Sequence, residues 1–176
     1  METARKSLYT LRGITIGYLS MGAPPLPAQD DCKAFAKLLT DAFAKLNTNP
    51  ARVHSTRTAR GGASNTDLIY AAGSIYMNIG GKWITAGPIK DAVQQMEQLM
   101  QNPTGKATCR YVKDEPVNGE MAALYTVHSE TAKAWHDTQV WISKAKGLLL
   151  RQDLESNEGK SISSTFYEYG NVKPPL

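Results

Sequence analysis

Short strand patterns separated by turn residues fill most of the chain after Pro50, and only one helical pattern interrupts them. Strands and helices therefore do not alternate as they do in a parallel Rossmann-type sheet. An antiparallel sheet can pack one face against helices and leave the other face to solvent. The pattern predicts a mainly β (α+β) protein, with a curved antiparallel sheet or incomplete β-barrel of about nine or more strands closed by helices. The expected strands cover residues 51–60, 68–70, 75–77, 82–84, 107–114, 120–129, 136–143, 148–155 and about 160–169.

Glycine-containing turns separate these strands. Gly80 and Gly81 suit a two-residue hairpin, because the favoured hairpin turns need positive φ. Residues 144–147 suit a type I turn followed by a glycine in the left-handed region. Residues 61–65 and 116–119 are also expected to be turns.

Two segments have the amphipathic spacing of helices. The first covers residues 32–46. The second covers residues 88–101 and starts at Pro88, because a proline at the first helical position loses no hydrogen bond. The expected apolar faces consist of Phe35, Leu38, Leu39, Ala42, Phe43 and Leu46 in the first helix, and of Ile89, Ala92, Val93, Met96, Leu99 and Met100 in the second. We expect both faces to pack into the concave side of the sheet.

Residues 1–29 have the order of residue types found in a secretory signal peptide. Arg5, Lys6 and Arg12 precede a mildly apolar run over residues 13–23, and a proline-containing segment follows. A disordered N-terminal arm is the alternative interpretation. Residues 30–176 are expected to form a single domain, which is long enough to bury a core. These features predict an exported, periplasmic protein.

Net charge and hydropathy argue against a nucleic-acid partner and against a membrane-spanning helix. The formal net charge is +4 and the basic residues are scattered, whereas a nucleic-acid-binding protein usually carries a denser basic stripe. No run of 18 apolar residues is present, so a conventional membrane-spanning helix is not expected. We predict no nucleic-acid partner and no stable membrane span, and the sequence does not indicate an oligomeric state.

The chain has two cysteines, Cys32 at the start of the first helix and Cys109 in a strand pattern. They lack the CxxC or cysteine–histidine grouping of a zinc site. In an oxidising periplasm a disulfide between them would close a segment of 78 residues (109 − 32 + 1). Loop-closure entropy gives such a bridge about 4.5 kcal/mol of stabilisation before any strain is subtracted. Two separate buried thiols are the alternative.

No pattern marks a catalytic, metal or cofactor site. His54, His128 and His136 lie on three different strand patterns. His128 begins the HxE half of the zinc-deaminase motif, but the PCxxC half is missing. The chain also lacks HExxH and the GxSxG nucleophile elbow. We therefore predict a non-enzymatic protein with no catalytic residues, no metal and no cofactor.

The remaining functional signal is apolar. The second helix places Met96 and Met100 on its inner face, and methionine suits surfaces that accept varied apolar partners. A concave sheet lined by aromatic residues and covered by this helix would form a hydrophobic ligand cavity. The same residues would also fill a packed core, so both interpretations stand. The candidate cavity and lid residues are Phe43, Trp83, Ile89, Val93, Met96, Met100 and Trp141.

Two hairpins carry a resemblance to a known family. Residues 139–152 are QVWISKAKGLLLRQ and residues 79–83 are IGGKW. They resemble the vWID-x-x-tGLPLR and nGKxW hairpins of LolA-like periplasmic proteins. The order of leader, helix, strands, inserted helix and strands is also similar, and residues 166–172 resemble the terminal strand of that superfamily. The resemblance covers roughly residues 31–172.

This resemblance implies an incomplete β-barrel closed by helices, and a non-enzymatic carrier that holds an acyl chain or a lipoprotein in its apolar hollow. LolA carriers keep a strand arginine that holds the helical lid, and Arg57 and Arg60 are the candidates for that role here. An envelope protein-interaction module without a small ligand is the alternative function, with the sheet edge available for strand addition. A third possibility is an enzyme whose site no motif marks.

Overall fold

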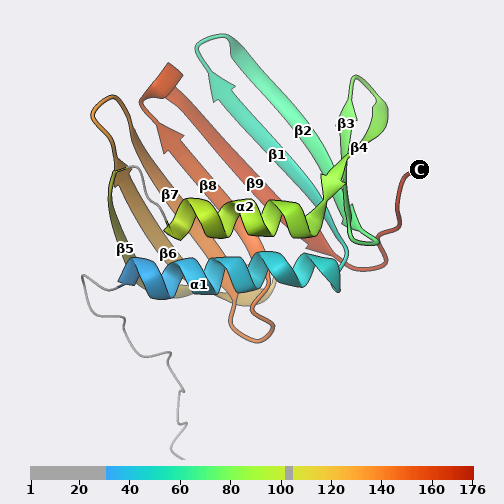
Figure 1. Cartoon of the computed structure of the whole chain (residues 1–176), viewed down its shortest axis with the longest axis horizontal. Coiled ribbons are helices and arrows are strands. Elements are labelled where there is room, and N and C mark those ends of the chain that lie inside the picture. Colours follow the sequence, from blue (N-terminus) through green and yellow to red (C-terminus); the bar gives the residue numbers. More distant parts are fainter. Residues whose placement is uncertain (1–30, 102–104) are drawn as a thin grey trace, which may run out of the picture.

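The computed structural model describes residues 31–101 and 105–176, so the predicted leader at 1–29 lies outside the described residues. The helices are α1 (Asp31–Ala44) and α2 (Ile89–Gln101). The strands are β1 (Ala51–Ala59), β2 (Gly62–Ala71), β3 (Ser74–Ile79), β4 (Lys82–Pro88), β5 (Lys106–Val117), β6 (Glu120–Glu130), β7 (Trp135–Ser143), β8 (Leu149–Ser156) and β9 (Ser161–Tyr169). The predicted fold class, a mainly β protein with an open, curved antiparallel sheet and two helices, is confirmed (Figure 1).

The strand order in the sheet is β4-β3-β2-β1-β9-β8-β7-β6-β5, with every pair antiparallel. The strands β4 and β5 follow each other along the chain but lie at opposite edges of the sheet. The chain must therefore cross the sheet between them, and α2 makes that crossing (Figure 1). The inserted helix is a consequence of this topology, because a short loop cannot join two strands at opposite edges.

Three two-residue hairpin turns have positive φ at both positions, as primed turns require. They are Ala72 and Gly73, Gly80 and Gly81, and Asn118 and Gly119. The predicted turn at residues 80–81 is thus confirmed. Gly147 also has a positive φ of 64°, as expected for residues 144–147.

Three predicted boundaries are wrong. Residues 62–67 belong to β2 and pair with β1, because backbone pairing does not need the apolar side chains used to locate strands. Only the second half of the expected turn at 116–119 is a turn, since Val117 is the last residue of β5. Pro88 ends β4, and α2 begins one residue later, at Ile89.

The main core lies between the helices and the sheet. Alternate residues of each strand face the helices, as the two-residue repeat requires, and pack against the apolar face of α1. Phe35, Leu39, Ala42 and Leu46 supply the helical side, as predicted. Val53, Tyr70, Tyr125, Val140, Ile142, Leu149 and Tyr167 supply the sheet side.

A second, smaller cluster lies on the opposite face of the sheet. It consists of Val117, Ala122, Leu124, Trp141 and Leu150. Trp141 stands between Val140 and Ile142, which both face the helices, so strand alternation directs it outward. Buried apolar side chains therefore lie on both faces of the sheet in this region.

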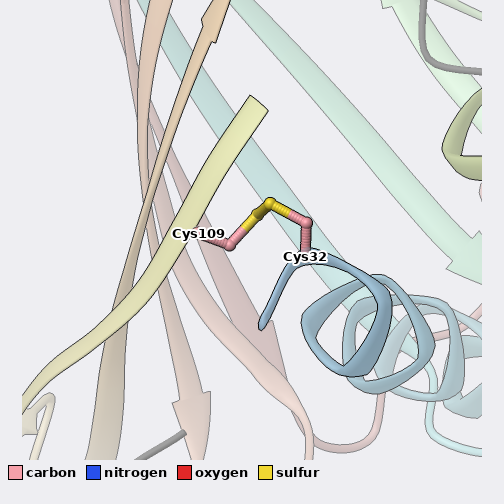
Figure 2. The surroundings of a disulfide bond; sticks show 2 residues. All are labelled: Cys32 and Cys109. Atoms are coloured by element: carbon pink, nitrogen blue, oxygen red, sulfur yellow. A yellow bond between two sulfur atoms is a disulfide. The ribbon is translucent and has the colours of Figure 1, made fainter. Parts of the chain in front are cut away.

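A disulfide joins Cys32, in the first turn of α1, to Cys109 in the edge strand β5 (Figure 2). Their Cα atoms lie 4.9 Å apart, within the usual range for a bridge. The disulfide alternative is thus the one that the structure supports. The bridge fixes the start of α1 against the edge of the sheet.

Candidate functional site

The apolar stripe of α2 becomes progressively less covered toward the end of the helix. Ile89 is fully buried in the core, whereas Val93 and Met96 are only partly buried against it. At the last turn, Leu99 is 64% exposed and Met100 is 40% exposed. The helix is thus anchored at Ile89, while its C-terminal half presents uncovered apolar side chains. Neighbouring exposed apolar residues of this kind often mark a binding surface.

A groove runs between the two helices. Its volume is about 680 Å³, and Met100 and Glu97 line it from α2. Lys33, Ala36, Lys37, Thr40 and Asp41 line it from α1. The groove therefore has a mixed character, with one exposed methionine among charged and small side chains.

The core beneath the helices is filled rather than hollow. Phe43 packs edge-on against Tyr70, with ring centres 6.2 Å apart, and Phe35 lies 5.4 Å from Tyr125. Burial raises the pKa of Tyr70 and, more strongly, that of Tyr167. Both phenols are therefore neutral at physiological pH and contribute to the apolar packing. An apolar ligand would have to displace packed side chains to reach these rings.

The helix-facing side of the sheet changes character beyond the helices. In β1 the inward residues run from Val53 in the core to Ser55 and Arg57. In β9 they run from Tyr167 to Thr165, Ser163 and Ser161. Figure 1 shows the hairpins β1–β2 and β8–β9 extending well past α2, so that no helix covers this end. Inward positions that are apolar under the helices are thus mostly hydroxyl-bearing beyond them.

These inward residues line a cavity of about 610 Å³, which we call the hydroxyl trough. It is lined by Ser55, Arg57, Ser64, Thr66, His136, Leu154, Ser156, Glu158, Ser161 and Ser163. The hydroxyls of Ser55 and Thr165 lie 3.0 Å apart across β1 and β9. Sequence reasoning missed this trough. The alternation of Ser161, Ser163 and Thr165 was the available signal, but hydroxyl residues on a strand are ordinarily assigned to its solvent face.

The predicted cavity residues are only partly brought together. Ile89, Val93 and Met96 lie on α2 and contact the core, and Phe43 joins them from α1. Met100 lies at the exposed end of the same helix. The first four residues form one apolar region at the helices, and Met100 lies outside it, in the groove between α1 and α2.

Trp83 and Trp141 do not belong to that region. Trp83 pairs with Asn78, whereas its neighbour Ile84 is in register with Met77 and Leu68 on the helix-facing side. Strand alternation therefore places Trp83 on the opposite face. Trp141 is buried in the outer cluster. The prediction that these two tryptophans line the hollow is corrected by the register of their strands.

Trp141 instead takes part in a charged cluster on the outer face. Its indole Nε1 donates a hydrogen bond to Glu115 Oε1 at 2.6 Å. The guanidinium of Arg151 lies 4.7 Å from the centre of the Trp141 ring and 5.0 Å from that of Phe166. Asp153 holds the same guanidinium through two hydrogen bonds. The polar groups of Trp141 and Arg151 thus have partners within this cluster, which favours a structural role for both residues.

The two candidate lid arginines lie away from the helices. Arg57 lines the hydroxyl trough, and Arg60 lies in the β1–β2 turn at the far end of the sheet. Arg57 is four residues beyond Val53, which is about 13 Å at the rise of an extended strand. Neither arginine forms a hydrogen bond or ion pair with a helix residue in the described part of the chain. The predicted lid contact is therefore not made in this structure.

The outer face carries two histidine–aspartate pairs. His54 lies 2.7 Å from Asp67, and His128 lies 2.6 Å from Asp137. All four side chains are about half exposed. Within residues 31–101 and 105–176, no group of three or more ligating side chains is placed to hold a metal ion. No helix in those ranges is long and apolar enough to cross a membrane.

Several solved structures share this fold. Lipoprotein LppX from Mycobacterium tuberculosis matches with a TM-score of 0.52 and 11% sequence identity, over 81% of this chain and 98% of LppX. MucB in complex with MucA(peri) matches with a TM-score of 0.50 and 14% identity, over 80% of this chain and 57% of that chain. The complex of MucA and MucB from Pseudomonas aeruginosa gives a TM-score of 0.50 and 13% identity, over 80% and 58%.

No protein-family model matches the sequence, and no curated protein matches it either. The likeness to these structures is therefore one of fold alone, and in this chain that fold is an open nine-stranded antiparallel sheet with two helices packed on one side. The structural match to LppX covers almost the whole length of that chain. The fold is the LolA-like fold that the two hairpin motifs predict.

Proposed function

We propose that this protein is a periplasmic, non-enzymatic binding or carrier protein for a hydrophobic ligand, either a free acyl chain or one attached to a lipoprotein. The observation that carries the proposal is the graded exposure of the α2 stripe. Ile89 is fully buried, but Leu99 and Met100 are uncovered. A soluble domain rarely leaves adjacent large apolar residues exposed at a helix end without a partner for them.

The ligand would lie along the C-terminal half of α2. Met96 and Met100 are unbranched and adapt to apolar partners of different shapes. Because the core is filled, a longer chain would enter by displacing this half of the helix from the sheet, with Ile89 as the fixed point. Because Leu99 and Met100 in the last turn are exposed, this displacement would cost little free energy.

Two further observations support the proposal. The Cys32–Cys109 disulfide is typical of proteins that fold in an oxidising compartment. The fold is shared with LppX, which is a lipoprotein, and with MucB, which is found in complex with MucA(peri).

Substitutions on α2 test the proposal. Leu99→Asp and Met96→Asp place a carboxylate in the stripe, and Gln94→Asp adds the same charge on the opposite, exposed side of the helix. Titration with a fluorescent apolar probe, 1-N-phenylnaphthylamine, measures binding. We expect both stripe variants to bind at least about tenfold more weakly, because ligand contact would bury the new charge.

Gln94→Asp is the matched control and should keep the affinity of the wild type. Leu99 is exposed, so Leu99→Asp should fold normally, which circular dichroism would verify. Unchanged probe binding by folded Leu99→Asp would contradict the proposal.

A second candidate function is an envelope protein-interaction module, and the β4 edge favours it. Within the described sheet β4 has one neighbour, β3, and the hairpin exposes Ile79 and Ile84. The other edge strand, β5, has a bulge in mid-strand near Tyr111, whereas the bulge and the proline of β4 lie at its end, at Ala86 and Pro88, and leave residues 82–85 regularly paired. Recovery of one stoichiometric protein partner, together with no probe binding, would favour this function over the carrier.

A further inference from the structure

The hydroxyl trough is a polar surface on the side of the sheet that normally packs against apolar groups. Its lining includes six serine and threonine residues from β1, β2, β8 and β9, together with one arginine and one histidine. Hydroxyl groups both donate and accept hydrogen bonds, and they adapt by rotation. Aromatic side chains, on which a sugar ring would stack, are absent from its described lining. The trough therefore suits a small polar group that accepts several hydrogen bonds.

Arg57 gives the trough its charge preference. Its side chain is exposed and has no hydrogen-bond or ion-pair partner among the described residues. The guanidinium offers five donors in a planar fork that matches carboxylate and phosphate groups. Glu158 is the acidic residue in the described lining, and it lies in the β8–β9 connection. Arg57 thus brings unused cationic donors into the hydroxyl trough, and His136 also lines it.

The trough and the apolar stripe of α2 lie on the same side of the sheet. Figure 1 shows α2 between α1 and the uncovered ends of the strands. Glu97 lines the groove that faces α1, and Leu99, two residues later, lies on nearly the opposite side of the helix. Leu99 is therefore directed away from α1, toward the end of the sheet that holds the trough.

The boundary between the two surfaces is sharp. Val53 and Tyr167 are core residues, and the next inward residues along their strands are Ser55 and Thr165. A ligand that crosses this boundary needs an apolar part on the side of the helices and a polar part on the side of the trough. This is the chemical pattern of an amphiphile.

We infer that the hydroxyl trough binds the anionic head group, a phosphate or a carboxylate, of an amphiphile whose chain lies along α2, with Arg57 as the residue that recognises its charge. The inference rests on the proposed function, because it assigns the second half of the same ligand. It adds selectivity: the protein distinguishes anionic lipids from neutral lipids with the same chain.

Two lipids that differ only in the head group test this inference. Palmitoyl-lysophosphatidic acid and monopalmitoylglycerol share the chain and the glycerol, and only the first carries a phosphate. Isothermal titration calorimetry below the micellar concentration would compare their affinities for the wild type, Arg57→Gln and Arg52→Gln. Arg52 is the matched control, because it lies on the same strand, is exposed and lines a different cavity, on the opposite face.

We expect the wild type to prefer the phosphorylated lipid by about tenfold or more, the range for hydrogen bonds to a charged group. Arg57→Gln should abolish that preference and leave binding of monopalmitoylglycerol unchanged, while Arg52→Gln should keep the preference. Equal binding of both lipids by the wild type, or a preference that survives Arg57→Gln, would overturn the head-group assignment and leave the carrier function standing. Binding of neither lipid would overturn both.

Discussion

At the scale of single residues, the two-residue repeat of the strands decides which side chains can share a site. Val140, Trp141 and Ile142 are all apolar, yet the middle one faces away from the helices. The sequence alone could not indicate which face each would occupy, because a run of apolar residues loses the alternation that distinguishes the faces. Arg57 is the opposite case. The resemblance to LolA-like proteins makes it a functional candidate, but its setting among hydroxyls depends on strands far apart in the sequence.

Glu120 provides a residue-scale test of the outer face. Hydrogen bonds from Ser143 Oγ and from Lys146 Nζ hold the pKa of this carboxyl below its ordinary value of 4.5. A lowered pKa in the folded state means that the carboxylate stabilises the fold above that ordinary value. The contribution is lost as the pH falls through the folded-state pKa.

We therefore expect Ser143→Ala to raise the pKa of Glu120 toward 4.5, as measured by NMR titration of the side-chain carboxyl. Lys146→Gln should raise it less, because Lys146 is 61% exposed and its charge is screened by solvent. Stability of the wild type should decline more between pH 5 and 3 than that of Glu120→Gln, about the interval where the carboxylate protonates. A wild-type Glu120 that titrates at its ordinary value would contradict this description.

At the scale of the elements, α2 combines an anchored end with an uncovered end. Hydrophobic periodicity predicted the helix and its apolar face, because the spacing of Ile89, Val93 and Met96 is local information. It did not predict that the burial of this face would decrease along the helix. That gradient depends on where the helix crosses the sheet, which follows from β4 and β5 lying at opposite edges.

Alanine substitutions at the two ends should reveal the gradient. Ile89→Ala should lower the free energy of unfolding by about 2–5 kcal/mol, the range for a fully buried large-to-small change. Leu99→Ala should change it by about 0.5 kcal/mol or less, as expected at an exposed position. Urea denaturation with equal m-values would measure both. Similar losses at the two positions would show that the last turn of α2 is packed as firmly as the first.

At the scale of the whole molecule, the fold was predictable because strand patterns, glycine turns and two short hairpin motifs are all local signals. The strand at residues 62–67 and the hydroxyl trough could not be predicted in the same way, because a polar strand differs from a loop only through its pairing partners. The Cys32–Cys109 disulfide joins two elements that are far apart in the sequence. It fixes the start of α1 to β5, whereas no disulfide holds the described part of α2, whose last turn exposes Leu99 and Met100. The proposed carrier function would use this difference between the two helices.

The most direct test of the carrier function is native mass spectrometry of the protein expressed with residues 1–29 and recovered from the periplasmic fraction. We predict a mass that lacks the leader, a deficit of two hydrogens from the Cys32–Cys109 bridge, and a non-covalent adduct of lipid mass that is lost in the Leu99→Asp variant. Protein that is exported and oxidised but consistently free of any adduct would contradict the account and favour the interaction module.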